Sequence, residues 1–162
     1  MTDHWYQLSS FEWNALILSL KISIWSILLS LPFGIALSWL LAKKEFRGKT
    51  LVESFLLLPL VLPPVVVGYL LLIAFGQNGV FGSFLHKIGI ELVFNWKGAC
   101  LAAIFMSFPL LVRSLRISFE AIDKQLEEVA TTLGAKPLDQ FFSITLPLCL
   151  PGLISGSILA FT

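Results

Sequence analysis

Residues 128–147 read EVATTLGAKPLDQFFSITLP, a polar segment that lies between two apolar stretches. Just before its central glycine, apolar side chains recur every three to four residues: Leu126, Val129 and Leu133. This spacing is typical of one face of a helix. We therefore expect a helix over residues 117–133.

Two residues predict how that helix ends and how the next one begins. Gly134 can take the left-handed conformation that often follows the last helical residue. Pro137 suits the first turn of a helix, where its missing N–H is not needed. The following helix would carry an apolar face made of Leu138, Phe141 and Phe142. The segment thus predicts a helix–turn–helix that can insert into a groove of a partner protein.

The composition outside this segment is that of a membrane protein. Of the 162 residues 57% are hydrophobic and only 13% are charged, whereas a soluble domain has roughly a quarter of its residues charged. The net charge is +1, and no basic stripe is present, which argues against a nucleic-acid partner. We expect an integral membrane protein with lipid around it.

The residue types needed for catalysis or metal binding are sparse. Cys100 and Cys149 lie in apolar stretches. A redox pair or a metal site is one interpretation, and two buried thiols that pack as small hydrophobes is the favoured one. His4 and His86 are isolated, and no paired acids or nucleophile–base pair lie at membrane depth. We therefore expect no metal, no cofactor and no catalytic residues.

Four apolar stretches follow one another along the chain, at about residues 15–42, 51–75, 99–112 and 146–162. A spanning helix needs about 20 residues, so the sequence predicts an all-α integral membrane fold with about four spans. Pro32 and Gly34 predict a kink in the first, and the third should continue as helix through Phe119. The last stretch stops at Thr162 without a closing flank, so we expect a fragment that lacks C-terminal helices.

The charges of the connections predict the orientation. Four cations crowd the first connection: Lys43, Lys44, Arg47 and Lys49. By the positive-inside rule this connection is cytoplasmic, which places the N-terminus outside. The third connection, residues 113–145, is then cytoplasmic as well. Lys21 is the basic residue inside an apolar stretch, and near the outer end it can extend its ammonium to the interface.

The second apolar stretch contains an interruption. Residues 58–69 read LPLVLPPVVVGY, and prolines remove helical hydrogen bonds. Lipid cannot satisfy the freed backbone groups, so this segment should be buried in protein or line a cavity. Interrupted spans mark substrate pathways in many transporters, and a structural kink is the alternative. The candidate pathway residues are Pro59, Pro63, Pro64 and Gly68.

Small residues near the C-terminus predict close helix packing. Gly152 and Gly156, with Ser155 and Ser157 beside them, form a small-xxx-small face. This face can serve a dimer interface or packing within one chain, and the sequence leaves both open.

The helix–turn–helix segment also carries a spaced pattern, E-x-A-x3-G-x9-I-x-L-P. Its six positions are Glu128, Ala130, Gly134, Ile144, Leu146 and Pro147. The pattern resembles the EAA loop of bacterial ABC-importer permeases, the cytoplasmic segment through which the membrane subunit binds its ATPase. Three further stretches, LPLVLPPVVVGYLLL (58–72), SLPFG (30–34) and SFPLLVRSLR (107–116), are similar to the molybdate-importing permeases of the sulfate/molybdate group.

This resemblance implies a fold and a set of roles. Residues 1–162 would be the transmembrane domain of a type I ABC importer, without the family's C-terminal helices, and residues 113–145 its cytoplasmic coupling loop. Glu128 would face a basic group of the ATPase, and Ala130 would let the partner backbone approach closely. Gly134 would permit the tight turn.

The resemblance also implies an activity. The chain would be the permease subunit of an importer in the bacterial inner membrane, with a periplasmic N-terminus, that moves molybdate by alternating access. Its partners would be a second permease copy, a separate ATPase subunit that hydrolyses ATP, and a periplasmic molybdate-binding protein. The alternatives are a permease for sulfate, thiosulfate or tungstate and, from another class, a membrane scaffold that docks a cytoplasmic protein.

Overall fold

The computed structural model describes residues 10–76, 79, 81–83 and 95–161. His4, His86 and Thr162, on which some of the expectations rest, lie outside these residues. The described part of the chain is helical and contains no strand, in agreement with the predicted all-α fold. The helices are α1 (Ser10–Lys43), α2 (Lys49–Val61), α3 (Pro64–Phe75), α5 (Trp96–Glu120), α6 (Lys124–Thr132), α7 (Pro137–Gln140), the π-helix η1 (Phe141–Thr145), α8 (Leu146–Leu148) and α9 (Leu150–Phe161).

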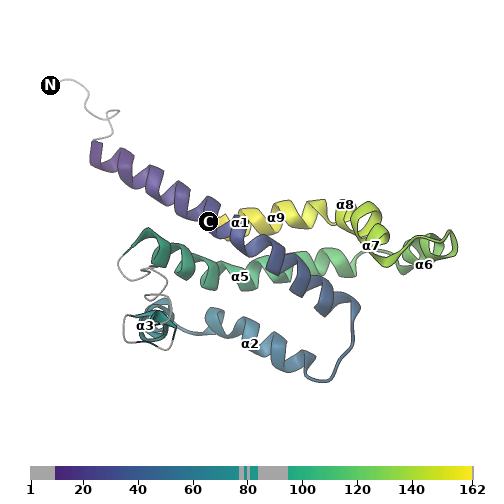
Figure 1. The fold of residues 1–162 in the computed structure, drawn as a ribbon, viewed down its shortest axis with the longest axis horizontal. Helices are drawn as coiled ribbons and strands as arrows, with labels where there is room; N and C mark the ends of the chain where they lie inside the picture. The colour runs from purple at the N-terminus through teal and green to yellow at the C-terminus, as the bar shows by residue number, and fades with distance from the viewer. Residues whose placement is uncertain (1–9, 77–78, 80, 84–94, 162) are drawn as a thin grey trace.

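Helix α5 is the centre of the molecule, because α1 and α9 both pack along it (Figure 1). Its side chains Leu111, Leu115 and Phe119 are fully buried. They form the core together with Ile122 and Cys149. Partly buried side chains of α1 surround this core: Leu31, Ile35, Trp39 and Ala42. Cys100 is buried too, so both thiols lie among packed side chains, as the favoured interpretation predicted.

Helix α1 approaches α5 through a stripe of small residues that recur every fourth position: Ser26, Ser30, Gly34 and Ser38. All four are buried, and the serine hydroxyls donate to carbonyls of α1 itself, as in the 2.6 Å bond from Ser38 Oγ to Gly34 O. A Cβ added at Gly34 would lie 2.9 Å from Leu111 Cδ2. The small residues therefore allow the two backbones to come close. This stripe was not predicted, although its spacing is visible in the sequence.

Helix α9 also packs on α5 through small residues. Gly152 and Gly156 are buried, and a Cβ added at Gly152 would overlap the side chain of Ser118. Ser114 Oγ lies 3.3 Å from Gly152 O, to which it donates, and 3.1 Å from Ser155 Oγ. The sequence left open whether this small-residue face serves a dimer interface or packing within one chain. In the structure it packs within the chain.

Among the described residues, α1 and α5 are each long and apolar enough to cross a membrane, and two further spans are present if each bent helix pair counts as one. The α2–α3 pair bends by 111°, and the helical segment Pro137–Leu148 bends by 64° before α9. The predicted number of about four spans holds on that count. The predicted interruption of the second stretch is confirmed, and it lies at Leu62 and Pro63.

Two local expectations concern the course of α1 and the end of α5. Helix α1 continues through Pro32 as a single helix of 34 residues, and the kink at Pro32 and Gly34 stays a prediction. The predicted helix over residues 117–133 is wrong, because α5 ends at Glu120 and α6 begins at Lys124. Asp123 causes the new start, since its carboxylate accepts a 2.9 Å hydrogen bond from the Gln125 backbone N–H and so caps α6.

Candidate functional site

The six-position pattern folds around an open apolar groove. The groove has a volume of about 530 Å³. One wall comes from α6 and the turn after it, and the other from η1 and α8; the lining residues are Leu126, Val129, Ala130, Leu133, Ser143, Ile144, Pro147 and Leu148. Three of the six pattern residues, Ala130, Ile144 and Pro147, therefore meet in one place although up to 17 positions separate them in the sequence.

The turn at the end of α6 is built as the sequence predicted. Gly134 has φ of 84°, a left-handed conformation that a side chain would resist. The Ala135 N–H donates to Ala130 O at 3.0 Å and the Gly134 N–H donates to Thr131 O at 3.0 Å. These bonds satisfy carbonyls that the last turn of a helix leaves without partners. Pro137 is the first residue of α7, as expected.

The segment of residues 121–148, which contains α6, α7, η1 and α8, forms a hairpin. A second contact that the sequence did not reveal closes this hairpin. Gln140 Nε2 donates to Thr131 Oγ1 and to Ala135 O, both at 3.0 Å. One side chain of α7 thus ties α7 to the end of α6. A glutamine nine residues from its partner has no distinctive local pattern, so only the folded hairpin identifies it.

The apolar side chains of this hairpin divide into two groups. Phe141 turns inward, with its ring centroid 6.1 Å from that of Trp39 and 6.5 Å from that of Phe119. Leu138 and Phe142 are exposed, and Leu133 is 82% exposed. The predicted apolar face of Leu138, Phe141 and Phe142 is therefore only partly correct, because Phe141 belongs to the core.

The remaining pattern residues occupy different environments. Glu128 is exposed on α6, and Leu146 is partly buried on α8. Ala130 is only 7% exposed and lines the groove from within. Access to Ala130 is therefore through the groove rather than across an open helix face.

The hairpin lies at the same end of the bundle as the cationic connection between α1 and α2, and α3 lies toward the opposite end (Figure 1). Within that connection Lys49 Nζ lies 2.7 Å from Glu45 Oε1. This hydrogen bond, with the attraction of the ammonium charge, lowers the pKa of Glu45 below its ordinary value, against a small opposing effect of burial.

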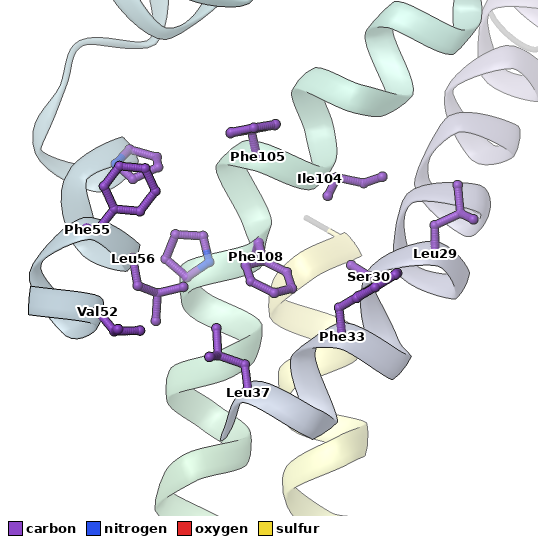
Figure 2. A pocket seen from close by; sticks show the side chains of 12 residues that line it. Leu29, Ser30, Phe33, Leu37, Val52, Phe55, Leu56, Ile104, Phe105 and Phe108 are labelled. Atoms are coloured by element: carbon purple, nitrogen blue, oxygen red, sulfur yellow. The ribbon is translucent and has the colours of Figure 1, made fainter. Parts of the chain in front are cut away.

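The four candidate pathway residues do not meet in one site. Pro59 lies inside α2, Pro63 and Pro64 lie at the start of α3, and Gly68 lies within α3. Pro59 lines a cavity of about 500 Å³. Figure 2 shows this cavity between α1, α2 and α5. Apart from Ser30, its walls are apolar, and the Ser30 hydroxyl donates to Ile27 O of its own helix. Such walls do not solvate an anion.

Lys21 makes a contact at the opposite end of the bundle from the hairpin. Its ammonium nitrogen lies 4.2 Å from the ring centroid of Trp96, at the start of α5. A cation over an indole face at this distance is a cation–π contact. The contact joins α1 to α5 and gives Lys21 a packing role. Among the described residues, no three His, Cys, Asp or Glu side chains gather as a metal site.

The family model described as binding-protein-dependent transport system inner membrane component matches residues 30–162. The molybdenum transport system permease protein ModB of Escherichia coli (strain K12) is 56% identical over 151 residues, which cover 93% of this chain and 66% of that protein. The molybdate/tungstate transport system permease protein WtpB of Pyrococcus abyssi is 44% identical over 133 residues, which cover 82% of this chain and 48% of that protein.

A solved structure shares the fold. A chain of a bacterial ABC transporter involved in the import of the acidic polysaccharide alginate superposes with a TM-score of 0.75 at 20% identity, over 94% of this chain and 57% of that one. In all three comparisons the chain spans less than two thirds of the other protein's length.

Proposed function

The chain belongs to the family of inner membrane components of binding-protein-dependent transport systems, and from this premise we propose that it is the permease subunit of an ATP-driven molybdate importer. The observation that carries the choice of substrate is the 56% identity to a molybdenum transport permease over 93% of the chain. Tungstate is the nearest alternative, supported by the 44% identity to a molybdate/tungstate permease. Sulfate and thiosulfate are the further alternatives within the group.

The hairpin is the proposed contact with the ATPase. The residues proposed to form this contact are those of the six-position pattern: Glu128, Ala130, Gly134, Ile144, Leu146 and Pro147. The apolar groove and the exposed Leu133 support the assignment, because both present apolar surface beyond the end of the bundle, away from the faces that lipid covers. ATP hydrolysis takes place on the ATPase, and this chain supplies no catalytic group.

The proposed orientation places the hairpin in the cytoplasm. Its support is the cluster of Lys43, Lys44, Arg47 and Lys49 at the same end of the bundle. The N-terminus is then periplasmic, on the side where a molybdate-binding protein delivers the ion. Residues 113–145 form the cytoplasmic coupling loop of a transmembrane domain that includes the whole chain, and two permease copies form the pathway between them.

Transport proceeds by alternating access. ATP closes the ATPase dimer, the hairpins move with it, and the spans switch between inward-open and outward-open states. The passage holds the dianion weakly through hydroxyls, backbone groups and water, because apolar walls alone exclude a charge. The break at Pro63, with Pro59, Pro64 and Gly68 around it, is the proposed source of those backbone groups.

Uptake of labelled molybdate tests the proposal. Cells would carry the ATPase, the binding protein and either the 162-residue chain or a version extended to the length of its relatives. We expect the extended version to take up molybdate and an excess of sulfate to leave that uptake unchanged. Loss of uptake to modest sulfate would assign a sulfate importer instead. Absence of flux in both versions, with the ATPase still bound, would leave the docking scaffold as the function.

A further inference from the structure

Arg116 joins two carboxylates that belong to different helices. Its Nη1 lies 2.7 Å from Glu53 Oε1 on α2, and its Nε lies 2.7 Å from Glu120 Oε1 on α5. The side chains of Arg116 and Glu53 are 29% and 30% exposed, so water screens their attraction only in part. Hydrogen bonds between two ionised groups are roughly twice as strong as neutral ones.

The rest of α2 is held loosely. No residue of α2 is buried, and the cavity of about 500 Å³ separates one of its faces from α1 and α5 (Figure 2). Beside the ion pair a second cavity of about 110 Å³ lies between Leu56 and Leu57 of α2 and Val112 of α5. With little close packing around it, the Arg116–Glu53 pair is a directional contact that joins α2 to α5.

Arg116 and Glu53 each lie close to a segment with a proposed role in transport. Arg116 lies one turn before the end of α5, which leads through Asp123 into the hairpin. Glu53 lies less than two turns before Pro59 and nine residues before the bend at Leu62. The pair thus lies between the hairpin and the interrupted span.

We infer that the Arg116–Glu53 ion pair positions α2 on α5 and transmits displacement of the hairpin to the bent α2–α3 pair. Arg116 acts as a positioning residue, because its guanidinium binds the carboxylates of Glu53 and Glu120 and so acts through the placement of α2. The inference rests on the proposed function, in which the hairpin binds the ATPase and the interrupted span borders the pathway.

The chemistry of arginine suits this role. Glu120 holds the guanidinium from the same helix, four residues away, so the group is already oriented toward α2 before it meets Glu53. The planar fork then gives the contact with Glu53 a fixed direction, which the point charge of a lysine does not provide. A pair of this kind has a preferred geometry, so it resists sliding of α2 along α5, whereas an apolar contact is non-directional.

Two variants separate positioning from simple loss of charge. Glu53→Gln removes the carboxylate on α2, and Glu120→Gln removes the matched carboxylate on α5. Each takes one ionic partner from the same guanidinium, but only the first breaks a contact between helices. In the double variant Glu53→Arg with Arg116→Glu, the guanidinium stands on α2 and faces two carboxylates on α5.

Two measurements compare these variants with the unmodified protein. Both use the permease extended to the length of its relatives. The first is the spin-label distance distribution between Leu51→Cys on α2 and Ile117→Cys on α5, both exposed positions. The native thiols are buried, so a thiol-reactive nitroxide labels the added cysteines. The second is the amount of molybdate imported per ATP hydrolysed in the assembled importer.

We expect Glu53→Gln to broaden the distance distribution and to lower transport per ATP by about fivefold or more, the lower end of usual coupling effects. Glu120→Gln should change both by less than about twofold, and the double variant should narrow the distribution again. An unchanged distribution in Glu53→Gln, or equal effects of Glu53→Gln and Glu120→Gln, would overturn the inference. The distance measurement needs neither molybdate nor ATP, so failure of the proposed function would appear separately, as absent transport by the unmodified protein.

Discussion

The bundle of α1, α5 and α9 and the hairpin of residues 121–148 contain the same kinds of apolar side chain but bury them differently. In the bundle, Leu111 and Leu115 are fully enclosed by neighbouring helices. In the hairpin, Leu133 is 82% exposed, and Leu138 and Phe142 are exposed as well. The bundle thus encloses the apolar residues that face its own helices and exposes others on its outer faces, such as Phe33 at 70%, where lipid can cover them. The hairpin exposes apolar residues on a surface that is suited to a partner.

The two regions also obtain their shapes from different sources. The bundle depends on small residues that let helices far apart in the sequence come close, such as Gly152 against Ser118. The hairpin depends on local backbone signals, namely the cap at Asp123, the left-handed Gly134 and the helix start at Pro137. Substitutions in the bundle should therefore reduce stability, whereas those in the hairpin should reduce partner binding.

The largest effect is expected in the bundle, for Gly152→Leu. The new side chain would overlap Ser118, so α9 must move away from α5. Overpacking of this kind typically costs up to about 3 kcal/mol, and the midpoint of thermal unfolding in detergent should fall. Gly68→Leu is the control, because a Cβ added at Gly68 meets nothing within 4 Å. Equal loss of stability in the two variants would contradict the close contact of α9 with α5.

In the hairpin, Leu133→Ser should weaken ATPase binding without a change in stability. Burial of a leucine against a partner stabilises a complex by about 2 kcal/mol, so the dissociation constant should rise roughly thirtyfold. Isothermal titration with the ATPase measures this value. Leu51→Ser is the matched control, since Leu51 on α2 is 76% exposed and lies outside the hairpin. Unchanged affinity in Leu133→Ser would remove this side chain from the contact surface.

Two glycines in turns have a left-handed backbone conformation. Gly134 and Gly48 have φ of 84° and 99°, and an added Cβ would meet nothing within 4 Å at either position. Alanine in this conformation costs about 1–2 kcal/mol, so both substitutions should strain their turns alike. Only Gly134→Ala should reduce ATPase affinity, by about fivefold to tenfold. A similar reduction in Gly48→Ala would mean that the first connection binds the ATPase too.

The smallest effect is expected for Asp123→Ala, which removes the cap of α6. Loss of an N-cap typically costs about 1 kcal/mol, and the first turn of α6 should fray while the bundle stays intact. Amide hydrogen exchange should therefore accelerate at Gln125, the residue whose N–H bonds the Asp123 carboxylate. Asp123→Asn keeps an accepting oxygen and should exchange at nearly the original rate. Equal acceleration within α5 would show that α5 and α6 unfold as one unit.

The sequence predicted most of the features that depend on short stretches. The lengths of the apolar stretches predicted the spans, and the prolines of the second stretch predicted the break at Pro63. A glycine followed by a proline predicted the turn of the hairpin. The helix over residues 117–133 failed for a local reason as well. Asp123 offers the backbone a cap, and this competes with the continuous apolar spacing on which the prediction relied.

Contacts between distant segments were beyond the sequence. Phe141 belongs by its spacing to the same face as Leu138 and Phe142, yet it packs on Trp39, about one hundred positions earlier. The sequence also left open whether Gly152 packs against a second copy of the chain or against α5, and only the folded structure shows that it packs against α5. The groove around Ala130 likewise exists only because η1 and α8 return beside α6.

The sequence by itself determined the membrane class, the helical stretches, the broken span and the turn of the hairpin. These follow from side-chain hydrophobicity and from backbone sterics at single residues, which act over a few positions. Only the tertiary structure decided which faces meet: the small-residue contacts of α1 and α9 with α5, the groove, and the pairing of Arg116 with Glu53 across 63 positions. Such contacts depend on how whole helices pack, and helix packing arises from many side chains acting together.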